Sequence, residues 1–297
     1  MKKLISLFLA LVLCTGLVSC AVPAAPAAPA EPVKPSAEAP SAPAVEPAAK
    51  EKFVVGLECN YAPFNWTQAE QTQDSVVIPG GGFADGYDVQ IAKLIAEGLG
   101  RELVISKIEW DGLPPALLSG KIDAIIAGMS PTADRALTID FTDPYYESDL
   151  VVVVRKDSPY ASASSLADFA KAKITAQLNT FHYTVIEQIP DVQLQTAMDN
   201  FPTMIVALTS GTIDGYISER PGAVSATESN PEITFVEFAQ GKGFVASPED
   251  VAIAVGLQKG RPELVEQINS ILAGISKEQR QQMMDKAILA QPLSEEE

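Results

Sequence analysis

The eight residues ALLSGKID at positions 116–123 recur as ALTSGTID at positions 207–214, 91 residues further along the chain. In each copy an apolar helical stretch ends at a glycine, and a run suited to a buried strand follows. Because this unit belongs to the βαβ pattern, its duplication predicts two α/β units built on one plan. Ligands bind beyond the carboxyl ends of strands in open α/β sheets, so we expect residues 128–135 and 218–220 to face one cleft.

Strand and helix patterns alternate around both copies. Near the first copy, β-branched or apolar runs predict strands at 52–58, 102–109 and 122–127, and helical stripes predict helices at 88–99 and 113–118. Near the second copy, the same signals predict strands at 173–177, 192–196 and 213–218 and helices at 180–188 and 203–210. Each series predicts a mainly parallel sheet covered by helices.

Two apolar segments are candidates to join the two units. Residues 150–155 (LVVVVR) and 249–258 (EDVAIAVGLQ) are each long enough to leave one sheet and enter the other, which predicts a two-stranded hinge. Closure about a hinge around a ligand is an established domain motion. The predicted fold is therefore α/β, with two Rossmann-like lobes: residues 51–148 plus 252–297, where helices at 262–272 and 277–288 return to the first lobe, and residues 149–251.

Composition narrows the classes of function. The chain has 297 residues, of which 47% are hydrophobic and 20% charged, enough to give two modest domains a core each. A net charge of −17 repels phosphate backbones and argues against a nucleic-acid partner. Three cysteines and one histidine, His182, are too few for the usual zinc or iron–sulfur sites or for a disulfide framework. We therefore expect no metal and no cofactor.

The N-terminus is typical of a secreted lipoprotein. Lys2 and Lys3 precede an apolar run, so residues 1–19 are predicted to be a signal peptide. The sequence LVSC at 17–20 resembles the bacterial lipoprotein box, which implies cleavage before Cys20 and its acylation; several acyl chains give stable membrane anchoring. An ordinary signal peptide with a chance cysteine is the alternative. Residues 20–50, rich in alanine and proline, predict an extended linker that holds the folded part outside the cytoplasm.

Several motifs together resemble one protein family. They are YAPF at 61–64, GYDV at 86–89, WDGL at 110–113, GKID at 120–123, GMSPT at 128–132, Arg135 and DFTDPYY at 140–146. Over roughly residues 53–288 the chain resembles the extracytoplasmic solute-binding proteins, family 3, of polar amino acid ABC transporters. The resemblance implies a periplasmic-binding-protein-like (type II) fold. It also implies a monomer that captures a free L-amino acid and delivers it to a membrane permease and its ATPase.

The GMSPT motif and Arg135 are candidates to hold the α-carboxylate of the ligand. Ser130 before Pro131 predicts a helix N-cap, whose free backbone N–H groups face the cleft beside Gly128. A guanidinium can meet a carboxylate with two parallel hydrogen bonds, and the resemblance assigns that role to Arg135. The alternative is a surface arginine paired with Asp134 or Asp140.

The second lobe supplies the remaining contacts to the amino acid backbone. Glu219 ends the repeated strand where the family usually has an aspartate that binds the α-ammonium group; a solvated helix-cap glutamate is the alternative. Gln177 and Thr180 match family positions that complete the carboxylate and side-chain contacts. Asn179 stands where a glycine is common, which is a departure from the family pattern.

The charges predict the kind of side chain that is bound. Tyr61 and Trp110 match family positions that sandwich the substrate side chain, and Glu58 matches a position that is acidic in binders of basic amino acids. If Arg135 balances the ligand carboxylate and Glu219 its ammonium group, Glu58 stays uncompensated in a closed cleft unless the ligand brings a cation. Stacking on the two rings adds about 0.5–2 kcal/mol of cation–π attraction. We therefore predict a cationic amino acid, arginine ahead of lysine.

Alternatives remain at each of these positions. The aromatic residues could only pack the lobe, Trp66 and Gln68 could line the rim, and Glu58 could face solvent or pair with Lys107. A glutamine-type ligand stays open because Glu58 could be protonated or accept an amide hydrogen bond, and a histidine ligand is a weaker candidate.

Two other classes of protein are compatible with the chain. An extracytoplasmic cyclohexadienyl dehydratase uses the same fold, and Glu58, Glu219 or His182 could act as a general acid, but the sequence contains no catalytic motif. A sensory or adhesive lipoprotein that binds ligand without a transporter is the other class.

Overall fold

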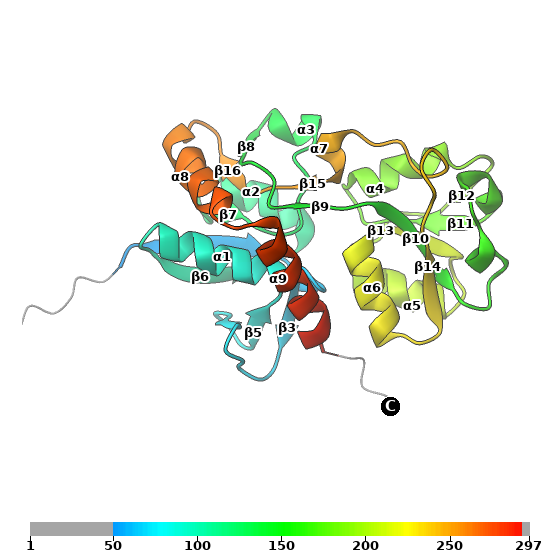
Figure 1. Ribbon diagram of the computed structural model, residues 1–297, viewed down its shortest axis with the longest axis horizontal. Coiled ribbons are helices and arrows are strands. Elements are labelled where there is room, and N and C mark those ends of the chain that lie inside the picture. The colour runs from blue at the N-terminus through cyan, green and yellow to red at the C-terminus, as the bar shows by residue number, and fades with distance from the viewer. Residues whose placement is uncertain (1–49, 293–297) are drawn as a thin grey trace, which may run out of the picture. The chain divides into compact units, whose positions relative to one another are not determined.

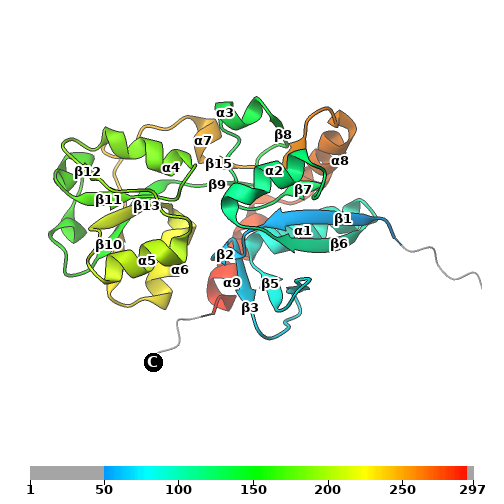
Figure 2. The same ribbon diagram turned by 180° about the vertical axis from the view of Figure 1, so that it is seen from behind.

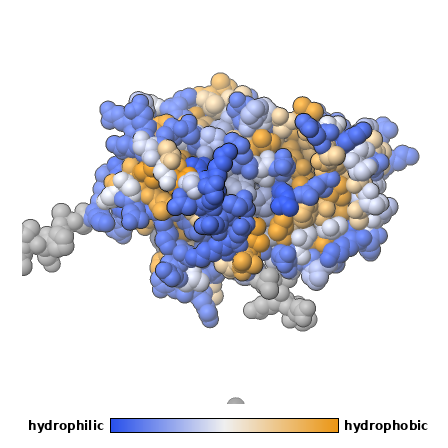
Figure 3. Space-filling model, viewed as in Figure 1, coloured by the Kyte–Doolittle hydropathy of each residue, from blue (hydrophilic) through white to orange (hydrophobic). Residues whose placement is uncertain are grey.

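The computed structural model describes residues 50–292. The predicted signal peptide (1–19), the lipidation site Cys20 and nearly all of the predicted linker (20–50) lie outside the described residues. Among residues 50–292, no helix is both long enough and apolar enough to cross a membrane. Hydrophilic side chains cover much of the face seen in Figure 3, with hydrophobic ones gathered in smaller patches.

The first lobe is built on a five-stranded mixed sheet (Figure 1). Its strands, in spatial order, are β6 (Glu102–Lys107), β1 (Lys52–Leu57), β7 (Ala124–Ile125), β16 (Gly256–Gln258) and β8 (Ile139–Phe141). The first three are parallel, whereas β16 is antiparallel to both of its neighbours. Helix α1 (Tyr87–Gly98) covers one face together with α8 (Pro262–Ala273) and α9 (Lys277–Ala290), and α2 (Leu113–Leu118) covers the other (Figures 1 and 2).

The second lobe repeats this arrangement. Its sheet has the order β12 (Gln193–Leu194), β11 (Lys173–Thr175), β13 (Gly215–Glu219), β10 (Leu150–Arg155) and β14 (Ile233–Val236). Strands β12, β11 and β13 are parallel, and β10 is antiparallel to β13 and β14. The helices are α4 (Phe181–Thr184), α5 (Phe201–Thr209) and α6 (Arg220–Ser229), with short 3-10 helices at Pro159–Ser162, Leu166–Phe169 and Val185–Gln188. The prediction of mainly parallel sheets is therefore right only for the βαβ part of each lobe.

The sequence repeat occupies the same place in both lobes. Gly120 and Gly211 end α2 and α5 in the left-handed region, with φ of 73° and 75°. The aspartate that closes each copy then binds the neighbouring parallel strand, β1 or β11: Asp123 Oδ2 accepts from Val54 N at 2.8 Å, and Asp214 Oδ2 accepts from Lys173 N at 2.9 Å. The repeated residues thus form a helix stop and a side-chain link between neighbouring strands at the same place in both sheets.

The chain crosses between the lobes just before β10 rather than through it. Strand β9 (Tyr146–Glu147) pairs antiparallel with β15 (Ala252–Ile253), which follows helix α7 (Pro248–Val251). Residues 150–155, predicted to form one hinge strand, lie wholly in the second sheet. All of β10 from Leu150 to Val154 is buried because helices and loops cover both faces of that sheet, so its apolar run reflects burial and not a crossing.

A small antiparallel sheet that the sequence analysis did not predict extends the first lobe. It consists of β2 (Asn60–Tyr61), β3 (Asn65–Gln68), β5 (Phe83–Asp85) and β4 (Val76–Val77). Trp66 and Gln68 lie on β3, where the indole N–H of Trp66 donates to Gln68 Oε1 at 2.9 Å. Two-residue strands carry too little periodicity to be recognised from sequence, although this sheet sets the position of Tyr61.

Candidate functional site

A narrow cavity lies where the carboxyl ends of the parallel strands of both sheets meet. It is lined by Tyr61, Trp110, Ala127, Gly128, Ser130 and Arg135 from the first lobe, and by Gln177, Thr180, Phe181, His182, Phe201 and Glu219 from the second. Eight of the nine residues predicted for ligand binding line this cavity, and Glu58 is hydrogen-bonded to one of them. The cavity measures about 10 Å³, room for one water molecule, so the lobes must part before an amino acid can enter.

Arg135 connects the two lobes across this cavity. Its Nη1 donates to Ser130 O at 3.0 Å, its Nη2 donates to Asn179 O of the second lobe at 3.0 Å, and the guanidinium carbon lies 5.1 Å from the centre of the Trp110 ring. Burial lowers the pKa of Arg135 to about 10, which still leaves the side chain charged at neutral pH. The alternative of a surface arginine paired with an aspartate is wrong: Asp140, one such candidate, binds Lys259 instead.

The predicted helix cap at Ser130 is displaced by two residues. Helix α3 (Ala133–Ala136) begins after Thr132, whose side-chain oxygen accepts from Arg135 N at 3.4 Å. Ser130 is buried before this helix, and its carbonyl oxygen holds the guanidinium of Arg135. The prediction placed the cap too early because Thr132 is also a good N-cap residue, and the sequence alone did not distinguish the two.

Asn179 fits the backbone conformation that a glycine would adopt. Its φ of +56° lies in the left-handed region, which glycine enters at no cost and asparagine more readily than most other residues. The Asn179 side chain adds a contact between the lobes, because its Nδ2 donates to Asp111 Oδ1 at 2.9 Å. The departure from the family pattern therefore preserves the turn that presents Asn179 O to Arg135.

Glu219 forms the acidic side of the cavity and is almost completely buried. Its Oε1 lies 3.0 Å from His182 Nε2, and its Oε2 accepts a hydrogen bond from the Tyr61 hydroxyl of the other lobe. Burial raises the pKa of Glu219, but the electrostatic interaction with the adjacent His182 and the hydrogen bond from Tyr61 outweigh it, so the pKa lies below its ordinary value. Glu219 is thus a buried carboxylate and not a solvated helix cap.

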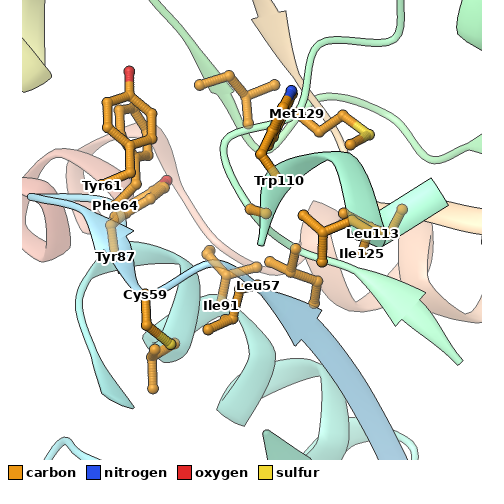
Figure 4. Close-up of a cluster of buried hydrophobic side chains, with 14 of the residues drawn as sticks. Leu57, Cys59, Tyr61, Phe64, Tyr87, Ile91, Trp110, Leu113, Ile125 and Met129 are labelled. Atoms are coloured by element: carbon orange, nitrogen blue, oxygen red, sulfur yellow. The ribbon is translucent and has the colours of Figure 1, made fainter. Parts of the chain in front are cut away.

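The aromatic residues enclose the cavity from both lobes. The Tyr61 ring stacks on Phe64 of its own lobe with a centroid distance of 4.9 Å (Figure 4), and on Phe201 of the second lobe with a distance of 4.1 Å. Gly128, with φ of +64°, permits this close approach, because a Cβ there would lie 3.0 Å from the Tyr61 ring. Trp110 covers Arg135 from the first lobe.

Glu58 lies at the edge of the cavity and is 2% exposed. Its Oε2 accepts from Gln177 Nε2 of the second lobe at 3.0 Å, while Oε1 is buried with no hydrogen-bond partner among residues 50–292. Burial raises the pKa of Glu58 to about 7, and the Gln177 hydrogen bond opposes this rise. The alternatives that Glu58 faces solvent or pairs with Lys107 are wrong, because it is buried and Lys107 Nζ donates to Thr67 Oγ1 at 2.8 Å.

Other lining residues were not predicted to bind the ligand. The sequence indicates His182 only as a candidate general acid and assigns no role to Phe181 and Phe201, although all three line the cavity. His182 follows Thr180 by two residues at the start of α4, a spacing that could have suggested a common cleft. Trp66 and Gln68, considered for the rim, are absent from the residues lining this cavity. Within the described part of the chain, no group of three or more His, Cys, Asp or Glu residues could hold a metal ion.

Two α/β lobes, a two-stranded hinge and a buried cleft with charged groups from both lobes define a type II solute-binding protein. The chain belongs to the bacterial extracellular solute-binding proteins, family 3, whose family model matches residues 53–289.

Similar proteins and solved structures support this assignment to the family. A probable histidine-binding protein of Campylobacter jejuni is 33% identical over 192 residues, covering 64% of this chain and 69% of the relative. The arginine-binding protein 1 of an Escherichia coli ABC transporter is 27% identical over 237 residues, covering 77% and 86%. The Streptococcus pneumoniae substrate-binding protein AbpA, solved with L-arginine, matches with a TM-score of 0.67 and 27% identity, covering 80% and 95%. These relatives are binding proteins of transport systems and not enzymes.

Proposed function

We propose that this protein is the substrate-binding subunit of an amino acid ABC importer and that it captures a cationic L-amino acid, arginine ahead of lysine, by closure of its two lobes. The observation that carries the choice of ligand is Glu58, a buried carboxylate with one oxygen lacking a hydrogen-bond partner among the described residues. A buried ionised carboxylate is costly unless a charged or hydrogen-bonding partner compensates it. A ligand guanidinium or ammonium group supplies that partner.

The three charged groups of the cleft correspond to the three charges of arginine. In this proposal Arg135 binds the α-carboxylate, helped by the backbone of Gly128 and Ser130 and by Thr180, and Glu219 binds the α-ammonium group. Arg135 at present donates to the carbonyl oxygens of Ser130 and Asn179. Glu219 accepts from the Tyr61 hydroxyl at Oε2, and its Oε1 lies 3.0 Å from His182 Nε2. A zwitterion would give both groups an oppositely charged partner, and a two-pronged pair between a guanidinium and a carboxylate adds geometric specificity as well as binding energy.

The side chain of the ligand would lie between Trp110 and Tyr61 and end at Glu58 and Gln177. The relatives support this class of ligand, because several are named for arginine, among them a Bacillus subtilis extracellular protein. We also propose the bounds of the two lobes as residues 51–148 plus 252–297 and 149–251, and a monomeric protein.

A neutral glutamine-type ligand is the second candidate. The Gln177 amide already donates to Glu58, which supports the view that a ligand amide could do the same. Relatives are also named for glutamine, histidine and cystine, so the family accommodates different side chains. Isothermal titration calorimetry of the purified protein with the twenty amino acids tests the proposal. Arginine or lysine should bind most tightly, and tightest binding of glutamine or histidine would contradict a cationic ligand.

The binding of arginine should depend on pH through Glu58. Because burial raises the pKa of this carboxyl to about 7, its ionised fraction falls about ten-fold between pH 8 and pH 6. A cationic ligand binds the ionised form, so we expect arginine affinity to fall by roughly the same factor over this range, as measured by calorimetry. The Glu58→Gln variant should lose this component of the pH dependence. An unchanged profile in that variant would show that another group causes it.

The family is extracellular, so the protein works outside the cytoplasm. We further propose that Cys20 carries a lipid anchor after removal of residues 1–19 and that residues 20–50 form the linker to the folded part. Replacing Cys20 by serine should release the protein from the membrane fraction, because several acyl chains are needed for stable anchoring. Cell fractionation checks this, and arginine affinity should not change. Persistent membrane association of Cys20→Ser would contradict anchoring through this cysteine.

A further inference from the structure

A buried chain of hydrogen bonds lies beneath the first lobe's half of the cleft, centred on Asp88. The side chain of Asp88 is fully buried in the first turn of α1. Its Oδ2 accepts from Asn65 Nδ2 at 2.8 Å, and its Oδ1 accepts from the Tyr145 hydroxyl at 2.7 Å. Burial raises the pKa of Asp88 to about 6, and the bonds from Tyr145 and Asn65 oppose this rise. At neutral pH the group is therefore ionised and accepts from both donors.

Both ends of this chain terminate on the backbone of loops that line the cleft. Cys59 N donates to Asn65 Oδ1 at 2.7 Å, next to Glu58 and two residues before Tyr61. Gly128 N donates to the Tyr145 hydroxyl oxygen at 3.3 Å, in the loop that leads to Ser130. Three side chains, Asn65, Asp88 and Tyr145, thus connect Cys59 N to Gly128 N through four hydrogen bonds. These hydrogen bonds join the Glu58 loop to the Gly128 loop through side chains that do not line the cavity.

Helix α1 keeps the centre of this chain in a fixed position. Its first free N–H groups donate to the loop after Tyr61: Tyr87 N to Pro63 O at 3.0 Å and Asp88 N to Phe64 O at 2.8 Å. Gly86, with φ of +125°, makes the close packing possible, because a Cβ there would lie 2.4 Å from Phe64 O. The loop is therefore attached to the helix through its backbone, independently of the ligand.

We propose that Asn65, Asp88 and Tyr145 are positioning residues that fix the distance between Glu58 and the backbone of Gly128 to Ser130, and so set the length of the side chain that the cleft accepts. This inference rests on the proposed function, in which one loop meets the end of the ligand side chain and the other its α-carboxylate. A ligand one methylene shorter or longer must then displace one of the two loops. The hydrogen bonds resist that displacement, because Asn65, Asp88 and Tyr145 are each bonded on two sides and moving either loop would break one of these buried bonds.

Tyr145→Phe and Tyr87→Phe form a matched pair of variants for the test. Both tyrosines are fully buried and lie in one aromatic cluster, and each substitution removes one hydroxyl. The Tyr87 hydroxyl donates to Tyr145 O at 2.9 Å and takes no part in the hydrogen bonds that connect the two loops. The Tyr145 hydroxyl is one of the groups that form that connection. A general loss of packing or stability should affect both variants alike. A change in the accepted ligand length should occur only in Tyr145→Phe.

The measurement is the calorimetric affinity for three guanidinium amino acids: arginine, the shorter norarginine and the longer homoarginine. We expect the preference of the unmodified protein for one length to fall about three-fold to ten-fold in Tyr145→Phe, in line with the loss of one buried hydrogen bond, and to stay within about two-fold in Tyr87→Phe. Asp88→Asn should reduce the length preference as Tyr145→Phe does. Asn65 Nδ2 and the Tyr145 hydroxyl both donate to Asp88, and the amide NH2 group of an asparagine would face one of these two donors.

The possible failures have different signatures. If the unmodified protein binds neither these three compounds nor lysine, the proposed cationic ligand is wrong. If it binds them with a clear length preference that Tyr145→Phe and Tyr87→Phe leave equally intact, or reduce equally, the positioning role is overturned while the proposed function stands.

Discussion

Replacement of Arg135 by alanine is expected to abolish the thermal stabilisation that any amino acid gives to this protein. Arg135 donates to groups on both lobes and lies over Trp110, so the substitution removes the positive charge proposed for the ligand carboxylate and a contact between the lobes. Loss of one partner of a buried charge pair costs about 2–5 kcal/mol, or roughly 30-fold to several-thousand-fold in affinity. Differential scanning fluorimetry with and without ligand, followed by calorimetry, measures this loss.

Arg220→Ala is the matched control for Arg135→Ala. Arg220 also lies in the segment that follows a copy of the repeat, but it is exposed and pairs with Glu237 outside the cavity. Its removal should leave ligand affinity within about two-fold, because exposed ion pairs contribute little. Arg135→Lys should retain part of the affinity, since it keeps the charge and loses the paired hydrogen bonds. Near-normal affinity in Arg135→Ala would exclude this residue from the carboxylate site.

Replacement of Glu58 by glutamine is expected to separate charged from neutral ligands. Arginine should lose about 2–5 kcal/mol of binding free energy, because its guanidinium would be buried without a counter-charge. Citrulline has nearly the same shape without the charge, so its affinity should change little. Calorimetry with both compounds gives the difference directly. Equal losses for arginine and citrulline would contradict the cationic ligand.

Glu109→Gln is the control for nonspecific loss of negative charge. Glu109 is near enough to raise the pKa of Glu58, but it is exposed, so water screens its effect on the ligand. Its substitution should change arginine affinity far less than Glu58→Gln does. A comparable loss in both variants would mean that the general acidity of the cleft attracts the ligand and that Glu58 has no direct contact with it.

Glu58→Gln should lower arginine affinity but should not lower the stability of the ligand-free protein. The pKa of Glu58 in the folded protein, about 7, lies above its ordinary value of 4.5, so the folded state holds this proton more tightly than the unfolded state. The contribution of the group to stability is therefore full below pH 4.5 and is lost as the pH rises through about 7. At pH 8 without ligand, Glu58→Gln should be as stable as the unmodified protein or more so. A gain in stability with a loss of affinity is typical of a binding residue.

Local sequence was sufficient for most elements of both lobes. Helix α2 and strand β10 have the predicted bounds, and α1, α8 and β1 differ by one residue at one or both ends. Apolar periodicity, and glycine at a helix stop, are properties of neighbouring residues, so they can be recognised without the tertiary structure. The repeat also predicted which loops face each other, because parallel strands present their carboxyl ends to one side of a sheet.

The positions that sequence reasoning missed depend on residues far apart in the chain. The hinge strands β9 and β15 have two residues each and pair over about 100 positions, and the run at 150–155 looked like a hinge strand because burial on both faces makes it uniformly apolar. His182 became a site residue only when α4 brought it to Glu219, 37 positions away.

The sequence by itself determined that there are two similar α/β units, which loops end at the cleft, and which charges those loops carry. Only the tertiary structure decided which distant group contacts each of these charges. It paired Glu58 with Gln177, Glu219 with Tyr61 and His182, and Arg135 with Asn179. The reason is physical: secondary structure follows from the periodicity of near neighbours, whereas a buried charge is tolerated only where distant segments fold together to compensate it.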